Sequence, residues 1–182
     1  MKDLRFILGL IVLFFLPIIS QAQDSCAEFN KVLAMMKTAF STAKVGVGKK
    51  TITQYEVMEV TETVWPSSYK FPESLSSSIT EMDKKAPDSK MAAHNIYISC
   101  NFAKNISSTD ARAIYNRIRD KVKNCPPKNW KTKEVNEATY ARFMMMDGPY
   151  YDEAANKVTV LFNRLPNSEK CTVDIIFDTA VK

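Results

Sequence analysis

Apolar side chains recur along this chain with two different periods, which predict two helices and several strands. Over residues 26–43 they fall three and four positions apart, the spacing of one face of a helix, and Ser25 with Glu28 fits a capping box at its start. A coiled-coil seam is the alternative interpretation, but the pattern is shorter than a coiled coil requires. We therefore expect a helix that packs against a core.

A second amphipathic helix is predicted in the middle of the chain. It follows a strand-like stretch at residues 96–102, which is rich in β-branched and aromatic residues. The polar residues 107–110 can cap the first free amides of the helix, and apolar residues then recur at helical spacing as far as Cys125. Pro126 and Pro127 end it, because proline has no amide hydrogen and disfavours a helical conformation in the residue before it.

Shorter β-branched and aromatic stretches predict further strands. Residues 51–64 indicate one strand or a bent pair of strands, and residues 139–144, 158–163 and 171–177 indicate three more. Residues 65–90 contain prolines and many serines, and we expect a long loop there with at most one helical turn near residues 75–82.

This order of elements predicts an α+β protein. We expect an antiparallel sheet of four to five strands with two amphipathic helices packed on one face. The length fits a single domain over residues 23–182.

Residues 1–22 have the layout of a secretory signal peptide. Lys2 and Arg5 precede an apolar run over residues 6–19, and Ser20 and Ala22 place small residues where a signal peptidase cuts. The run is shorter than the roughly 20 residues of a membrane-spanning helix, so an uncleaved anchor is the weaker interpretation. The Gln-Ala-Gln ending resembles that of exported proteins of Bacteroidota-type bacteria, which implies a Gram-negative envelope or secretion. We expect a periplasmic or secreted protein with no transmembrane segment after cleavage.

Four cysteines in an exported chain predict two disulfide bonds. Metal binding is the alternative, but these cysteines lack the close pairing of zinc ligands. Cys26 begins one predicted helix and Cys125 ends the other, so the two meet if the helices run antiparallel. We therefore predict a bridge between Cys26 and Cys125 and, by elimination, one between Cys100 and Cys171.

Positive charge is concentrated in one window of the chain. Residues 112–133 hold eight lysines and arginines against a single acid, Asp120. A basic surface that includes an aromatic residue can attract an anionic partner such as a lipid headgroup, an acidic polysaccharide or nucleic acid. The candidate ligand-binding residues are Arg117, Lys121, Lys128, Trp130 and Lys131. The alternative is a solvated helix face that keeps the protein soluble.

No catalytic motif is evident in the sequence. His94 is the only histidine, and no motif places a nucleophile beside it, so an enzyme that uses His94 is the weaker hypothesis. Thioethers can bind copper(I), but of the three methionines at 144–146 only Met144 and Met146 can share a strand face, and methionine more often fills a core.

We predict no cofactor and no metal site. The expected function is that of an exported, disulfide-stabilised binding or structural module of the cell envelope. Its partner is unknown, and the candidates are an anionic ligand and an envelope protein.

Overall fold

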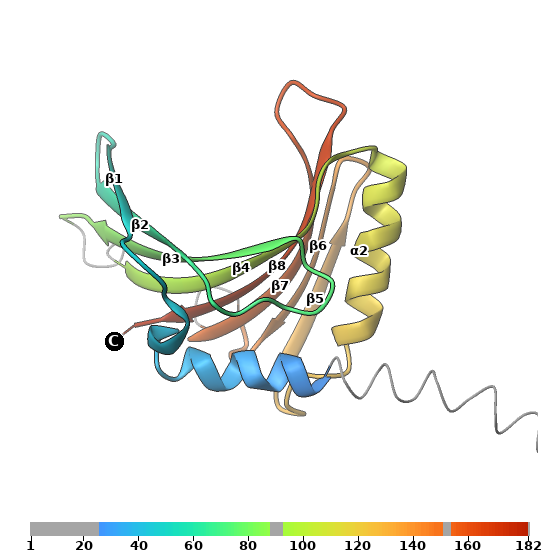
Figure 1. The fold of residues 1–182 in the computed structure, drawn as a ribbon, viewed down its shortest axis with the longest axis horizontal. Helices are drawn as coiled ribbons and strands as arrows, with labels where there is room; N and C mark the ends of the chain where they lie inside the picture. The colour runs from blue at the N-terminus through green and yellow to red at the C-terminus, as the bar shows by residue number, and fades with distance from the viewer. Residues whose placement is uncertain (1–25, 88–92, 151–153, 182) are drawn as a thin grey trace, which may run out of the picture.

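One antiparallel β-sheet dominates the fold in a computed structural model (Figure 1). The structure describes residues 26–87, 93–150 and 154–181, so the predicted signal peptide and Ser25 lie outside the described residues. The strands are β1 (Lys49–Gln54), β2 (Glu59–Pro66), β3 (Ser76–Lys85), β4 (Ala93–Ile106), β5 (Lys131–Asn136), β6 (Tyr140–Met146), β7 (Asn156–Arg164) and β8 (Cys171–Ala180). They lie in the order β1-β2-β3-β4-β8-β7-β6-β5, and each neighbouring pair is antiparallel.

The predicted sheet of four to five strands with two helices packed on one face is wrong, because a single sheet of eight strands forms most of the described chain. Residues 51–64 contribute two strands, β1 and most of β2, joined by a turn in which the Tyr55 amide donates to the Met58 carbonyl at 2.8 Å. β3 lies where the sequence predicts a loop, and β5 begins at the end of the basic window, where the sequence predicts no strand.

β3 and β5 escape detection because neither strand has a continuous apolar face. Only Ile79 and Thr80 are buried in β3, and every residue of β5 except Val135 is exposed. A strand of this kind lacks the alternation of apolar and polar residues that marks a half-buried strand in a sequence.

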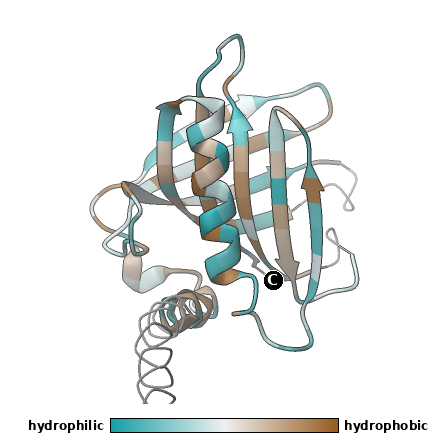
Figure 2. Cartoon of the chain, turned by 90° about the vertical axis from the view of Figure 1, so that its right-hand side faces the viewer, coloured by the Kyte–Doolittle hydropathy of each residue, from teal (hydrophilic) through white to brown (hydrophobic). Residues whose placement is uncertain are grey.

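Two helices lie against the sheet. The N-terminal helix is described over residues 26–36, and α2 spans Ser108–Val122. α2 begins as predicted, since the Ser107 hydroxyl oxygen accepts the Asp110 amide. It packs against β4, β7 and β8, and Figure 2 shows it standing in front of these strands with the N-terminal helix below it.

The N-terminal helix ends earlier than its apolar pattern suggests. Its helical residues stop at 36, and Phe40 adopts a left-handed conformation before a short 3-10 helix, η1 (Ser41–Ala43). Phe40 is nevertheless fully buried, and Phe29 meets Phe177 of β8 with 5.4 Å between ring centroids. The predicted apolar stripe therefore enters the core, although only part of it is helical.

A disulfide bond joins the two helices. Cys26 is bonded to Cys125, just beyond the end of α2, and their Cα atoms are 5.0 Å apart. This is the first of the two predicted bridges, and it fastens the N-terminal helix to the centre of the chain.

The predicted second bridge is not formed, because Cys100 and Cys171 are free and buried. They lie on the adjacent strands β4 and β8, but Cys100 is opposite Ile175 and Cys171 is opposite Ile106. An offset of four residues corresponds to about 13 Å along a strand, beyond the ~7 Å between Cα atoms that a disulfide can span. Burial also raises the pKa of the Cys100 thiol to about 11.

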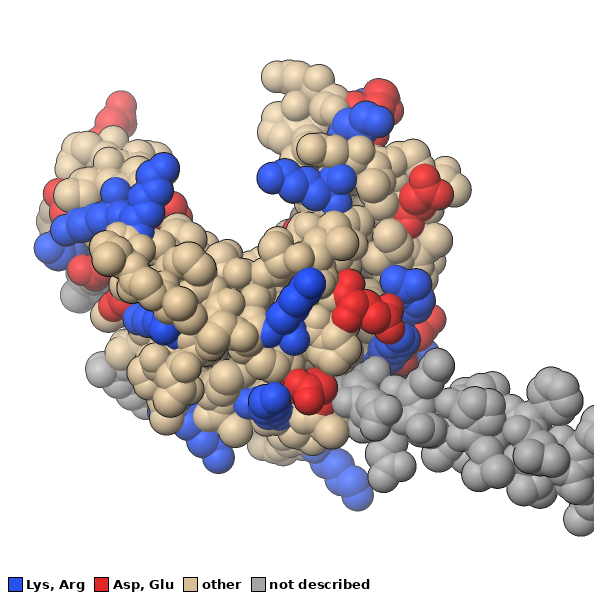
Figure 3. All heavy atoms as spheres, in the orientation of Figure 1, with Lys and Arg blue, Asp and Glu red and all other residues tan. Residues whose placement is uncertain are grey.

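The sheet has a covered face and an open face. The covered face holds the core, including Ile98, Val160 and Phe177, and packs against the helices and the segment before β3, where Phe71 meets Phe177 at 6.0 Å. The open face lies on the other side. The strands bend so that the β1–β2 hairpin and the β7–β8 hairpin rise on two sides of a hollow, with the helices outside the bend (Figures 1 and 3).

Candidate functional site

The basic side chains of α2, which were candidates for a binding surface, mostly pair with acids. Arg117 and Lys121 both bind Glu73 in the turn before β3, with 3.3 Å between Arg117 Nη2 and Glu73 Oε2. The other ion pairs of this region are Arg119 with Asp120 and Glu134, and Lys123 with Asp120. The charge of the helix is therefore largely neutralised within the protein.

The remaining three predicted residues follow α2 closely in the chain, but their side chains have different surroundings. Lys128 is exposed in the turn after the helix, and Trp130 is half-buried against the core, beside Leu33 in a pocket of about 330 Å³. Lys131 begins β5 and faces the open side of the sheet. Ligand binding by the five residues stays a prediction, but the structure does not gather them into one surface.

His94 forms a hydrogen bond with a carboxylate within the sheet. Its Nε2 lies 2.9 Å from Glu81 Oε1, and the Lys44 ammonium lies 3.1 Å from Glu81 Oε2. Burial alone would raise the pKa of Glu81, but the hydrogen bonds and charges of Lys44 and His94 outweigh it and hold that pKa below its ordinary value. Within the described residues, Glu81 is the only side chain that hydrogen-bonds His94.

The open face carries a pocket over β5 and β6, which we call the β5–β6 pocket. It measures about 570 Å³. Its lining consists of Lys131, Thr132, Lys133, Arg142, Met144, Met146, Pro149 and Tyr150.

Strand register explains how this pocket forms. Lys131 is directly opposite Met146, and Lys133 is directly opposite Met144. Because side chains alternate between faces, these four residues and Arg142 share the open face, while Met145 enters the core. Met144 and Met146 are 1% and 4% exposed, so they form an apolar floor.

Three cations surround the apolar floor. Lys131 and Lys133 are exposed, and within the part of the chain that the structure describes neither is paired with a carboxylate. Arg142 lies beside the Tyr140 ring, with 5.9 Å between its guanidinium carbon and the ring centroid. Tyr150 stands at the rim and is 67% exposed. Such a site can hold an anion that also carries an apolar group.

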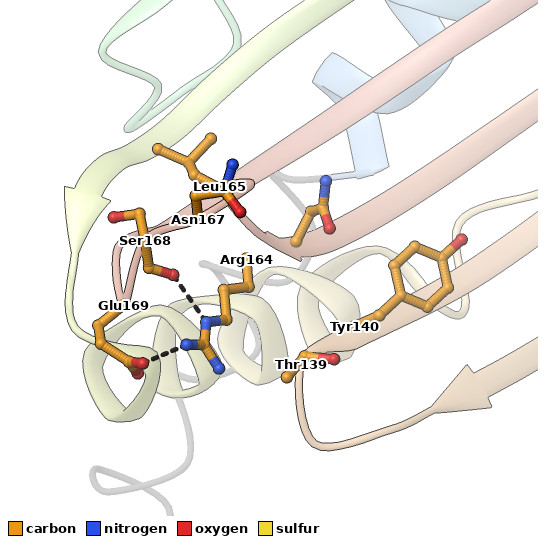
Figure 4. A pocket seen from close by; sticks show the side chains of 8 residues that line it. Thr139, Tyr140, Arg164, Leu165, Asn167, Ser168 and Glu169 are labelled. Atoms are coloured by element: carbon orange, nitrogen blue, oxygen red, sulfur yellow. Dashed lines mark hydrogen bonds and ion pairs between the residues drawn. The ribbon is translucent and has the colours of Figure 1, made fainter.

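A second, polar pocket of about 610 Å³ follows along β6 on the same face and is shown in Figure 4. Tyr140 and Asn163 form part of its lining. Arg164 turns back to the β7–β8 loop, where its Nε donates to the Ser168 carbonyl at 2.7 Å and its guanidinium pairs with Glu169. Its charge is thereby used within the loop, which leaves the β5–β6 pocket as the better anion site.

Sequence reasoning reached only part of this pocket. It named Lys131 and placed Met144 and Met146 on a common face. It missed Arg142, and it counted Lys133 in the basic window without naming it as a site residue. The signal is the alternation of lysines in β5, which becomes visible only when β5 is recognised as a strand paired with β6.

The described residues contain no group of three His, Cys, Asp or Glu side chains arranged to hold a metal ion. None of the described helices combines the length and the apolar character needed to cross a membrane. The fold and site define a helix-backed antiparallel sheet with a cationic pocket on its open face. Comparisons with protein-family models, curated proteins and solved structures give no match to this chain.

Proposed function

We propose that this chain is an exported, disulfide-stabilised binding protein of the cell envelope that takes an anionic, lipid-like ligand in the β5–β6 pocket. The ligand class is a carboxylate or phosphate joined to an apolar chain. The observation that carries this proposal is the position of the exposed lysines Lys131 and Lys133 directly opposite the buried side chains of Met146 and Met144.

The pocket favours an amphiphilic anion over the other anionic partners considered. Acidic polysaccharides and nucleic acids need long basic surfaces, whereas the cations of α2 are paired with Glu73, Asp120 and Glu134. A compact site with an apolar floor and a volume of about 570 Å³ is within the range of small-molecule pockets.

Export is supported by the order of basic, apolar and small residues in positions 2–22. The disulfide between Cys26 and Cys125 is compatible with an oxidising compartment.

Calorimetry with dodecyl phosphate and with laurate, both below their micelle concentrations, tests the ligand class. We expect saturable binding that weakens as salt is raised, and at least about tenfold weaker binding in the double variant Lys131→Gln/Lys133→Gln. The matched control Lys70→Gln/Lys170→Gln removes two exposed lysines elsewhere and should bind like the wild type. Equal binding of a dodecyl ammonium ion, or equal loss in both double variants, would contradict the proposal.

A further inference from the structure

Among the described residues, the β1 edge of the sheet exposes more large apolar side chains than the β5 edge does. All six residues of β1 are exposed. Six of the eight exposed large apolar residues among those described lie on this hairpin or just before it, namely Val45, Val47, Ile52, Tyr55, Val57 and Val64. At the other edge, β5 carries several charges, and the Arg112 side chain crosses from α2 to bind Asn136 and the carbonyls of Glu137 and Ala138. Covered edges resist strand addition, whereas all of β1 is exposed and its charges are confined to Lys49 and Lys50 at its start, which leaves Ile52 and its neighbours open to pairing.

The register of the hairpin shows which backbone groups of β1 are free. The Tyr55 amide donates to the Met58 carbonyl, so Tyr55 and Met58 form a hydrogen-bonded pair next to the turn. Hydrogen-bonded and non-bonded pairs alternate along an antiparallel ladder. Lys50, Ile52 and Gln54 therefore direct their amides and carbonyls away from β2, toward the unpaired edge.

The charged residues along this edge are basic at one end and acidic at the other. Lys49 and Lys50 begin the strand, and Glu56 and Glu59 follow at its far end. A two-fold axis through the middle of the strand would bring the basic end of one copy against the acidic end of another. A parallel arrangement would place like charges together.

We infer that two copies of this chain associate through antiparallel pairing of β1 with β1, which joins their sheets into one. With the axis at Ile52, the two Ile52 side chains lie opposite each other and Lys50 lies opposite Gln54 of the second copy. The free amides and carbonyls of Lys50, Ile52 and Gln54 are then all paired. Lys50 is also a diagonal neighbour of Glu56 of the second copy, close enough for long side chains to meet. This is a self-complementary interface of the kind that two-fold dimers use.

This inference does not rest on the proposed ligand, because β1 and β5 lie at opposite edges of the sheet. The interface consists of one short strand from each copy, so we expect weak association in the micromolar range.

Sedimentation velocity of the mature chain between about 5 and 500 μM tests the interface. The wild type should show a monomer–dimer equilibrium. Ile52→Pro should be monomeric throughout, since it removes an outward amide and leaves the β1–β2 ladder intact. Lys50→Glu and Glu56→Lys should each weaken the dimer about tenfold, because each places like charges across the axis.

An equimolar mixture of the Lys50→Glu and Glu56→Lys variants gives the sharpest result. The two charge changes complement each other only across an interface between copies, so the mixture should form a heterodimer more tightly than either variant pairs with itself. Lys128→Glu makes the same charge change at a distant site and should leave the equilibrium unchanged. A wild type that stays monomeric at 500 μM, or a dimer that is unaffected by all the β1 variants, would overturn the inference. The Lys50→Glu and Glu56→Lys variants test the interface even if the proline variant fails to fold.

Discussion

The contribution of Asp174, on the open face of the sheet, to the stability of the fold depends on pH. It lies in the middle of β8, where burial raises its pKa while hydrogen bonds from Asn101, at 2.9 Å, and from Thr172 partly oppose that shift. A carboxyl whose pKa is raised in the folded state binds protons more readily there than in the unfolded chain. Its contribution to stability is therefore present at low pH and is lost as pH rises through the folded-state pKa.

Replacing Asp174 by Asn should remove this dependence. We expect the Asp174→Asn variant to be at least as stable as the wild type at pH 7, because the amide keeps the shape and needs no buried charge. Its free energy of unfolding should also fall less between pH 4 and 7 than that of the wild type. Urea unfolding at a series of pH values measures both effects.

Glu81 provides the opposite case for comparison. Its pKa is lowered by Lys44 and His94 despite burial, so its contribution is present at neutral pH and is lost as pH falls through the folded-state pKa. Glu81→Gln should cost about 1 kcal/mol at pH 7, and the cost should shrink in acid. A loss of stability at pH 7 in Asp174→Asn as large as that in Glu81→Gln would refute the assignment of opposite signs.

Individual binding residues were predictable only where strand periodicity was already visible. Met144 and Met146 lie in β6, whose aromatic and apolar content marks it as a strand, and their shared face follows from alternation. The cations opposite them come from β5, which has no apolar pattern that would predict a strand. The sequence therefore suggests only a basic surface beside the helix, whereas in the structure these lysines line a pocket.

At the scale of elements, the sequence reveals those that bury an apolar face and hides those that do not. α2 and β8 follow their predicted patterns closely because one side of each packs in the core. β3 and β5 are held in the sheet by backbone pairing with their neighbours, and this pairing leaves no trace in the order of apolar residues. β1 is an exception, because its β-branched residues predict a strand although none of its residues is buried.

The disulfide acts at this scale because it fixes one helix to another. It closes a loop with a sequence separation of 99 residues, for which chain-entropy arguments give about 4–5 kcal/mol. The double variant Cys26→Ser/Cys125→Ser should lose about 2–5 kcal/mol in urea unfolding, with the N-terminal helix the first part to exchange its amide hydrogens. Wild-type protein in reductant should match the variant, and a variant as stable as the oxidised wild type would show that the bridge contributes nothing.

At the scale of the whole molecule, the sheet divides into a supported half and a bare half. β4, β8 and β7 lie behind α2, and their covered face is mostly apolar. The β1–β2 hairpin extends beyond the helices and forms one wall of the hollow in Figure 3. The proposed ligand pocket lies over β5 and β6 at one edge of the sheet and the proposed interface lies at the opposite edge, so ligand binding and association can be altered separately.

The oxidation states of the four cysteines offer a test of both the fold and the proposed export. Cys100 and Cys171 are buried and too far apart in register to bridge, so they can stay reduced even in an oxidising compartment, while Cys26 and Cys125 are already paired. Protein recovered without reductant should therefore begin near Gln23 and contain one disulfide. Alkylation should label no cysteine in the folded protein and two after unfolding in urea, as measured by intact mass.

Each departure from that mass pattern has a definite meaning. A chain that retains Met1 would contradict export, and labelling of four cysteines after unfolding would contradict the bridge. No labelling after unfolding would mean that Cys100 and Cys171 are joined, which requires β4 and β8 to pair about four residues away from the register described here. The register that keeps these two thiols apart also places Ile98 beside Phe177 in the core. A second bridge would therefore require a change of register that breaks the packing at the centre of the sheet.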